Sequence, residues 1–233
     1  MGKGQQRSAA KRINASRGRL ISVIACAALS ALFAACGGGP QNANVADPNE
    51  VNPNVKTGVK PEPDAEAAVI EMEDPAYGRI VLELYPNIAP KMVERFKTLA
   101  REGFYNGTAF HRVEPRANVI QGGDPNSKDA DPSNDGAGGS PYPDVPAEAS
   151  DLPYEPGTVG AADSGLDTAN SQFFITLGRM PQWEKRYTVF GRVVEGLGNA
   201  RVISTAPTRD GSTNPDPKIV IKSITLQPRA NFK

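Results

Sequence analysis

Short β-rich runs separated by turn residues occupy most of the chain between residues 68 and 228, and this spacing constrains the fold more than any other feature. Runs that are rich in β-branched and aromatic residues and bounded by Gly, Pro, Asn and Asp are typical of strands. The runs lie at residues 69–73, 79–85, 109–113, 119–123, 158–162, 173–177, 188–193 and 218–226. The first two flank a turn-forming segment, Asp74-Pro75-Ala76-Tyr77-Gly78, which predicts an antiparallel hairpin.

Only two stretches of this region predict helices. Pro90 can open a helix because the first turn needs no amide donor, and apolar residues then recur at helical spacing from Val93 to Ala100. A second, shorter helix is predicted at residues 200–204, and the polar, glycine-rich residues 124–140 predict an exposed loop. Many short strands with two helices indicate an all-β dominated fold, a closed antiparallel barrel that leaves no sheet edge.

The N-terminal third of the chain has a different composition. Residues 40–67 contain almost no large apolar side chains and are rich in Asn, Pro, Asp and Glu, which predicts a flexible tether. Ahead of it, six basic residues precede an apolar run at residues 20–35, the layout of a secretory signal. We therefore divide the chain into a signal peptide (1–35), a tether that starts at a lipidated cysteine (36–67), a globular domain (68–228) and a tail (229–233).

The end of the apolar run, Leu32-Phe33-Ala34-Ala35-Cys36, resembles a bacterial lipobox and predicts a lipid on Cys36. Several acyl chains anchor a protein stably, whereas one chain does so only marginally. Cys26 is the other candidate, but cleavage there would leave too short an apolar segment. A cleaved signal without lipid and a retained short anchor are the alternatives, and both also place the domain outside the cytoplasm. We expect a membrane-anchored lipoprotein of a bacterial cell envelope or periplasm.

Charge balance and residue counts exclude several classes of function. The chain has 26 basic and 26 acidic residues, so it has no summed positive field that would attract nucleic acid. Both cysteines lie in the leader, and the domain must therefore be stabilised by packing rather than by disulfides. His111 is the only histidine, and no Gly-x-Ser-x-Gly elbow accompanies it, so we predict neither a metal site, nor a nucleophile, nor a cofactor.

Three separated motifs carry the functional information: Phe110-His111-Arg112-Val113, Gln121-Gly122-Gly123-Asp124 and Ser171-Gln172-Phe173-Phe174-Ile175. In this order they resemble the signature of the cyclophilins, the cyclosporin-binding prolyl isomerases. The resemblance implies an eight-stranded barrel capped by two helices, and an enzyme that accelerates rotation about X-Pro bonds and so assists protein folding. It also implies proline-containing polypeptide substrates, cyclosporin-type ligands and a monomer.

The resemblance assigns the catalytic role to Arg112, and the chemistry of arginine suits the reaction. A peptide bond resists rotation by about 18–20 kcal/mol, and twisting it localises a lone pair on the proline nitrogen. A donor aimed at that nitrogen binds the twisted state better than either planar isomer. Arginine stays charged and offers several donors from a fixed fork. The matching family glutamine, here Gln121, contacts the substrate backbone and braces the arginine.

The remaining matches predict the substrate-binding surface. Phe174 matches the pocket phenylalanine of the family, and Phe173 should enter the barrel core because strand side chains alternate. Asp163 replaces the usual asparagine and adds a negative charge beside the groove, while Trp183 matches a position that contacts cyclosporin. The residues assigned to substrate binding are His111, Val119, Ala162, Asp163, Phe174, Trp183 and Tyr187.

The chain departs from the family pattern between Arg112 and Gln121, where it has one extra residue. The second pocket phenylalanine of the family then aligns with Asn118. Loss of that ring would remove apolar contact worth roughly 1.5–3 kcal/mol if it were fully buried, so we expect weaker substrate binding or a relaxed pocket. The alternative function is a proline-segment binding module or chaperone with weak or no turnover, which would not depend on Arg112.

Overall fold

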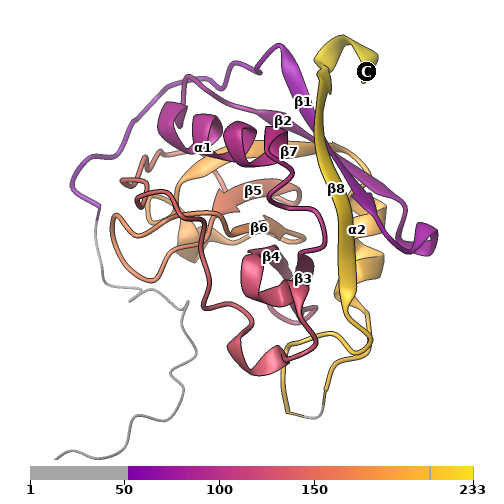
Figure 1. The fold of residues 1–233 in the computed structure, drawn as a ribbon. Coiled ribbons are helices and arrows are strands. Elements are labelled where there is room, and N and C mark those ends of the chain that lie inside the picture. Colours follow the sequence, from indigo (N-terminus) through magenta and orange to yellow (C-terminus); the bar gives the residue numbers. More distant parts are fainter. Residues whose placement is uncertain (1–51, 210, 233) are drawn as a thin grey trace, which may run out of the picture. The chain divides into compact units, whose positions relative to one another are not determined.

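Eight strands close into one barrel in the computed structural model, which describes residues 52–209 and 211–232 (Figure 1). Each strand pairs antiparallel with both neighbours in the order β1-β2-β7-β5-β6-β4-β3-β8, which confirms the predicted fold. The strands are β1 (Glu66–Met72), β2 (Arg79–Leu84), β3 (Ala109–Glu114), β4 (Val119–Asp124), β5 (Thr158–Ala161), β6 (Phe173–Thr176), β7 (Val189–Glu195) and β8 (Ile219–Pro228).

Two α-helices pack against the barrel, α1 (Pro90–Arg101) and α2 (Leu197–Ser204). Helix α1 begins at the predicted proline, and its first turn is capped from far along the chain. The Glu148 carboxylate accepts hydrogen bonds from the backbone N–H groups of Lys91 (3.2 Å) and Met92 (3.0 Å). A carboxylate at this end is favoured because the helix dipole is positive there. Among the described residues, no helix has the length and apolar character required to cross a membrane.

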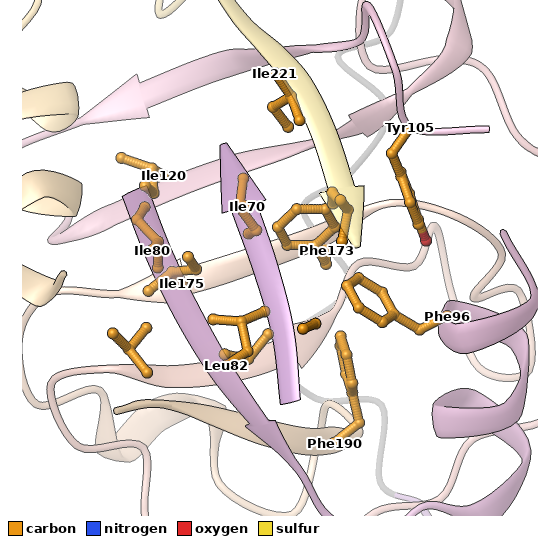
Figure 2. Packing of buried hydrophobic residues seen from close by; sticks show 14 of the residues in the cluster. Ile70, Ile80, Leu82, Phe96, Tyr105, Ile120, Phe173, Ile175, Phe190 and Ile221 are labelled. Atoms are coloured by element: carbon orange, nitrogen blue, oxygen red, sulfur yellow. The ribbon is translucent and has the colours of Figure 1, made fainter. Parts of the chain in front are cut away.

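Aliphatic and aromatic side chains fill the interior of the barrel (Figure 2). The ring of Phe96, from α1, lies with its centroid 5.6 Å from that of Phe173 and 5.3 Å from that of Phe190. Phe173 is fully buried in this core, as the alternation on β6 predicts. The next residue, Phe174, therefore faces the opposite side of the strand. Two adjacent residues of β6 thus point to the barrel core and to the outer side of the barrel.

Residues 52–65, which we call the strap, lie against the barrel rather than extending from it, and this corrects the predicted boundary of the tether. The Nζ of Lys56 donates to the backbone carbonyl of Ile88 at 2.6 Å. The Asp64 carboxylate accepts from the Nζ of Lys97 on α1 at 2.7 Å, and both groups are largely buried. The polar composition suggested a tether because the strap is held by hydrogen bonds and ion pairs, not by apolar burial.

The two ends of the domain prediction have different outcomes. The predicted signal peptide, Cys36 and the tether ahead of residue 52 lie outside the described residues. At the other end, β8 stops at Pro228 and a single 3₁₀ turn follows at Arg229–Asn231. The ring of Phe232 then packs beside Val81, so that the predicted tail is attached to the outer face of the barrel.

The loop that follows β4 is folded onto the barrel by polar contacts. The Asp124 carboxylate is fully buried and accepts from the backbone N–H groups of Asn126 (2.8 Å) and Gly136. The Nζ of Lys218 donates to the backbone carbonyls of Ser127 (3.2 Å) and Asp129 (2.8 Å). About half of the residues 124–140 are exposed, fewer than the predicted exposed loop implies, and these bonds give the loop a fixed path next to the site.

Candidate active site

One pocket on the outer side of the barrel gathers most of the predicted site residues. Strands β3, β4 and β6 each contribute, as do the segment after β5 and the residues that lead into β7. The residues that line it are Arg112, Val119, Gln121, Ala162, Asp163, Phe174, Trp183 and Tyr187. They come from separated parts of the sequence, and barrel closure brings them together.

Arg112 and Gln121 face each other across the β3–β4 pair, where they are register partners. The Nη1 of Arg112 donates to the Oε1 of Gln121 at 3.3 Å. On the other edge of the guanidinium, the Nε of Arg112 donates to the Oε1 of Glu114 at 2.6 Å. The guanidinium is therefore held between an amide and a carboxylate. The Arg112 side chain is 25% exposed and lines the pocket.

Gln121 is itself oriented by a second glutamine. Its Nε2 donates to the Oε1 of Gln172 at 2.9 Å. The Nε2 of Gln172 donates in turn to the carbonyls of Gly136 (2.9 Å) and Gly138 (2.8 Å) in the loop after β4. This chain of hydrogen bonds fixes which end of the Gln121 amide meets the arginine, so the oxygen is presented to the guanidinium. The sequence motif contains Gln172, but this orienting role was not predicted.

Four aromatic rings form the apolar floor of the pocket. Phe174 lies edge-on to Trp183 at a centroid distance of 5.0 Å and to Tyr187 at 5.4 Å. Beneath it, the fully buried ring of Tyr154 stacks on Phe174 at 5.9 Å. Edge-to-face and offset stacked geometries are the favoured ones for aromatic pairs, so the floor is stabilised before any ligand arrives. Tyr154 was not predicted, because nothing in its local sequence marks it as a neighbour of Phe174.

A sequence model of the cyclophilin-type peptidyl-prolyl cis-trans isomerase/CLD family matches residues 68–226. The chain belongs to this family of isomerases. The matched region is the barrel described above, and the chain is therefore a cyclophilin-type peptidyl-prolyl cis-trans isomerase.

Similar proteins from distant organisms support the assignment. A probable peptidyl-prolyl cis-trans isomerase of Brucella suis is 37% identical over 209 residues, which cover 87% of this chain and 96% of the relative. The isomerase ppi1 of Schizosaccharomyces pombe is 42% identical over 154 residues, covering 64% of this chain and 94% of the relative. A Cryptosporidium parvum cyclophilin crystallised in the presence of the dipeptide Ala-Pro has a TM-score of 0.61 and 29% identity, covering 69% and 98% of the two chains.

Asp163 of this cyclophilin does not add an unbalanced charge to the groove. Its Oδ1 lies 3.1 Å from the Nη2 of Arg186, and the two side chains are only 5% and 6% exposed. The Arg186 guanidinium also lies over the ring of Tyr187, 4.8 Å from its centroid. The acid that replaces the usual asparagine is thus matched by a buried base, a partner that the sequence motif alone did not identify.

Asn118, the residue predicted to stand in place of the second pocket phenylalanine, points away from the aromatic floor. Asn118 has a positive φ of 56° and closes the turn between β3 and β4. Its carbonyl accepts from the N–H of Leu177 at 2.7 Å, and its side chain lies against Gly178. The side chain that packs beside the aromatic floor is instead Ala117. Asparagine is suited to the left-handed conformation that this turn requires.

The structure does not place His111 among the residues that line the pocket, and its assignment to substrate binding stays a prediction. His111 is 4% exposed and lies beneath the loop at Gly136. Burial lowers the pKa of His111 to about 4, an effect that the nearby Asp135 carboxylate only partly opposes. The imidazole is therefore neutral at neutral pH and contributes to packing. In the part of the chain that the structure describes, no group of three His, Cys, Asp or Glu side chains could hold a metal ion.

Gly160 on β5 sets the depth of the aromatic floor, and Gly160→Ala should lower kcat/KM by about tenfold by displacing the Phe174 ring. A Cβ at this position would lie 2.3 Å from the Cζ of Phe174, so the ring would have to move. The measurement is the relaxation rate of a proline tetrapeptide as a function of substrate concentration. Gly198→Ala on α2 is the matched control, because a Cβ there meets nothing within 4 Å. Equal kcat/KM for the two variants would contradict the prediction.

Proposed function

We propose that this pocket is the active site of the isomerase, with Arg112 as the catalytic donor, Gln121 as its brace and Phe174 as the seat of the proline ring. The observation that carries the proposal is the meeting of the Arg112 guanidinium and the Phe174 ring in one pocket, with Gln121 3.3 Å from the guanidinium. A cation with several donors beside an apolar floor fits a substrate that is apolar at its ring and develops a lone pair at its nitrogen.

The reaction breaks no bond, so the site has to bind the twisted amide better than either planar isomer. As the X-Pro bond rotates, its resonance is lost and electron density returns to the proline nitrogen. An N–H group of Arg112 aimed at that nitrogen stabilises the twisted state. The contact with Gln121 means that the donor is oriented before the substrate binds, and a preorganised donor costs no reorganisation during the reaction.

The floor selects the proline ring by shape and polarity. Phe174 offers a ring of which the lower side already rests on Tyr154, and Val119 adds an aliphatic neighbour. Trp183 and Tyr187 stand edge-on to Phe174 and limit the lateral extent of the seat. Ala162 and Asp163 follow β5 directly and line the pocket beside this seat. The substrate class is therefore an extended polypeptide segment that contains proline, in agreement with the Ala-Pro dipeptide named for the Cryptosporidium parvum relative.

The test is cis–trans relaxation of a succinyl-Ala-Xaa-Pro-Phe anilide, followed by absorbance after a solvent jump so that no protease is needed. The protein should accelerate relaxation in proportion to its concentration and leave the equilibrium ratio of isomers unchanged. Relaxation at the uncatalysed rate would contradict the proposed function. It would favour the binding alternative, for which the small Ala117 beside the floor is the motivating observation.

We also propose that the enzyme works on proteins outside the cytoplasm, attached to a membrane through a lipid on Cys36. The support is the order of a basic segment, an apolar run and a cysteine in residues 1–36, followed by a polar stretch ahead of the strap. Chains that fold in that compartment contain X-Pro bonds of which the uncatalysed isomerisation takes tens to hundreds of seconds. An isomerase fixed near the membrane would act where such chains arrive.

Cys36→Ser should move the protein from the membrane fraction to the soluble fraction, because the lipid would have no attachment site. The full chain is produced in a bacterium that processes lipoproteins, and membranes and soluble fractions are compared by immunoblot, with incorporation of labelled palmitate as a second measurement. Cys26→Ser is the matched control and should stay in the membrane fraction with its label. Membrane retention and labelling of Cys36→Ser would contradict the lipid site.

A further inference from the structure

Glu114 is the last residue of β3 and follows Arg112 by two positions, so the two side chains project from the same side of the strand. The Oε1 of Glu114 lies 2.6 Å from the Nε and 2.6 Å from the Nη2 of Arg112. It thus occupies the edge of the guanidinium that is opposite the contact with Gln121. Glu114 is not among the residues that line the pocket, and it stands behind the arginine rather than beside the substrate seat.

The two partners of Arg112 differ in strength. The contact with Glu114 is short and joins two charged groups, whereas the contact with Gln121 is 3.3 Å long and has a neutral acceptor. Charge-assisted hydrogen bonds are shorter and about twice as strong as neutral ones. The orientation of the guanidinium therefore depends more on Glu114 than on Gln121, although the family resemblance points only to the glutamine.

The contact with Glu114 also leaves donors for a substrate. Arginine carries five N–H groups, and the contacts with Glu114 and Gln121 use three of them within the described residues. The two that remain belong to Nη1 and Nη2, at the outer end of the side chain. A flexible arginine would lose rotamer freedom when it engages the substrate, and a carboxylate on its inner edge reduces that cost beforehand.

We propose that Glu114 is a positioning residue for the isomerisation, which holds the Arg112 guanidinium with its outer N–H groups directed into the pocket. The inference rests on the proposed function, in which Arg112 donates to the prolyl nitrogen. Glu114 does not touch the substrate. Its loss therefore lowers the rate of the bound complex more than the affinity for the peptide.

The experiment compares kcat and KM of the full chain with those of Glu114→Ala and Glu114→Gln on the proline tetrapeptide. Glu114→Ala should lower kcat by about tenfold and should change KM by less than about twofold. A displacement of the donor by less than about 1 Å has a rate effect of that order. Glu114→Gln should recover most of kcat, since its amide oxygen can still accept from Nε and Nη2. Glu195→Ala is the matched control: it removes a carboxylate 2.7 Å from Arg79, outside the pocket, and should leave both constants unchanged.

A spectroscopic measurement reports the position of the arginine independently of turnover. In the wild type, the Nε–H of Arg112 should give a slowly exchanging cross-peak, assigned by its loss in Arg112→Ala. The peak should persist in Glu114→Gln and disappear by fast exchange in Glu114→Ala. An unchanged or raised kcat in Glu114→Ala, or equal losses in both Glu114 variants, would overturn the inference. If Arg112→Ala itself kept full activity, the proposed function would fail instead, so the two failures are distinguishable.

Discussion

Arg112→Ala is expected to lower kcat/KM for a proline tetrapeptide by about 100- to 1,000-fold, the loss typical when a preorganised donor to the transition state is removed. The guanidinium is the cation of the pocket that lies within reach of Gln121, and alanine leaves no donor for the prolyl nitrogen. Arg112→Lys should lose nearly as much, because a single ammonium cannot keep the contacts with Glu114 and Gln121 and also serve the substrate. The measurement is the relaxation assay with all three proteins at matched concentration.

Binding provides the control for this prediction. Trp183 is the only tryptophan of the chain and stands at the edge of the proline seat, so its fluorescence reports peptide binding directly. Peptide affinity of Arg112→Ala should fall by less than about fivefold, because the apolar floor remains. Arg101→Ala, which removes an exposed arginine from the end of α1, should not alter the rate. Retention of more than a tenth of the wild-type kcat/KM in Arg112→Ala would contradict the catalytic assignment.

Phe173→Ala and Phe174→Ala should have opposite profiles, although the two residues are adjacent on β6. Phe173 is buried among the rings of Phe96 and Phe110, and its loss should lower the free energy of unfolding by about 3–5 kcal/mol. Phe174 lies in the pocket, and its loss should raise KM by about tenfold with a smaller loss of stability, since the ring forms the proline seat. Urea unfolding and tetrapeptide kinetics on the two variants separate the effects.

The comparison is sharp because composition, strand and neighbouring sequence are the same in both variants. The prediction would be contradicted if Phe174→Ala were the less stable variant and kept the wild-type KM. Phe174 would then belong to the core rather than to the pocket. For Phe173→Ala, the midpoint of the urea unfolding curve should fall because stability is lost. The slope of the free energy of unfolding against urea concentration should change as well only if the variant exposes a different amount of surface on unfolding.

The barrel was predictable because its signals are local. Alternating apolar residues marked the strands, Pro90 marked the start of α1, and closure followed from many short strands with two helices. The strap was not predictable in the same way. Its residues are polar, and a polar segment reads as a tether unless its partners are known; those partners, such as Ile88 and Lys97, become neighbours only after the barrel has formed.

The site shows the same division between local and long-range information. Arg112, Gln121 and Phe174 were identified through motifs, which fix residue type and order along the chain. Glu114 was not predicted because its contact with Arg112 depends on the side-chain direction at the end of β3. Gly160 was not predicted because the sequence does not show that the Phe174 ring fills the space that a Cβ would occupy. His111 lies outside the pocket lining for a related reason: its neighbour Arg112 lines the pocket, but the loop at Gly136 covers the imidazole.

If Cys36 carries the proposed lipid, the strap limits how far from the membrane the enzyme can work. A fully extended chain spans about 3.5 Å per residue, so a free tether from Cys36 to residue 67 could reach about 110 Å. Since the strap holds the chain from Asn52 onward, the distance between a lipid on Cys36 and the barrel is at most about 55 Å. Under the proposed anchoring, confinement to so thin a layer would raise the effective concentration of the isomerase for polypeptides that emerge at the membrane, and would lower it for those that fold farther away.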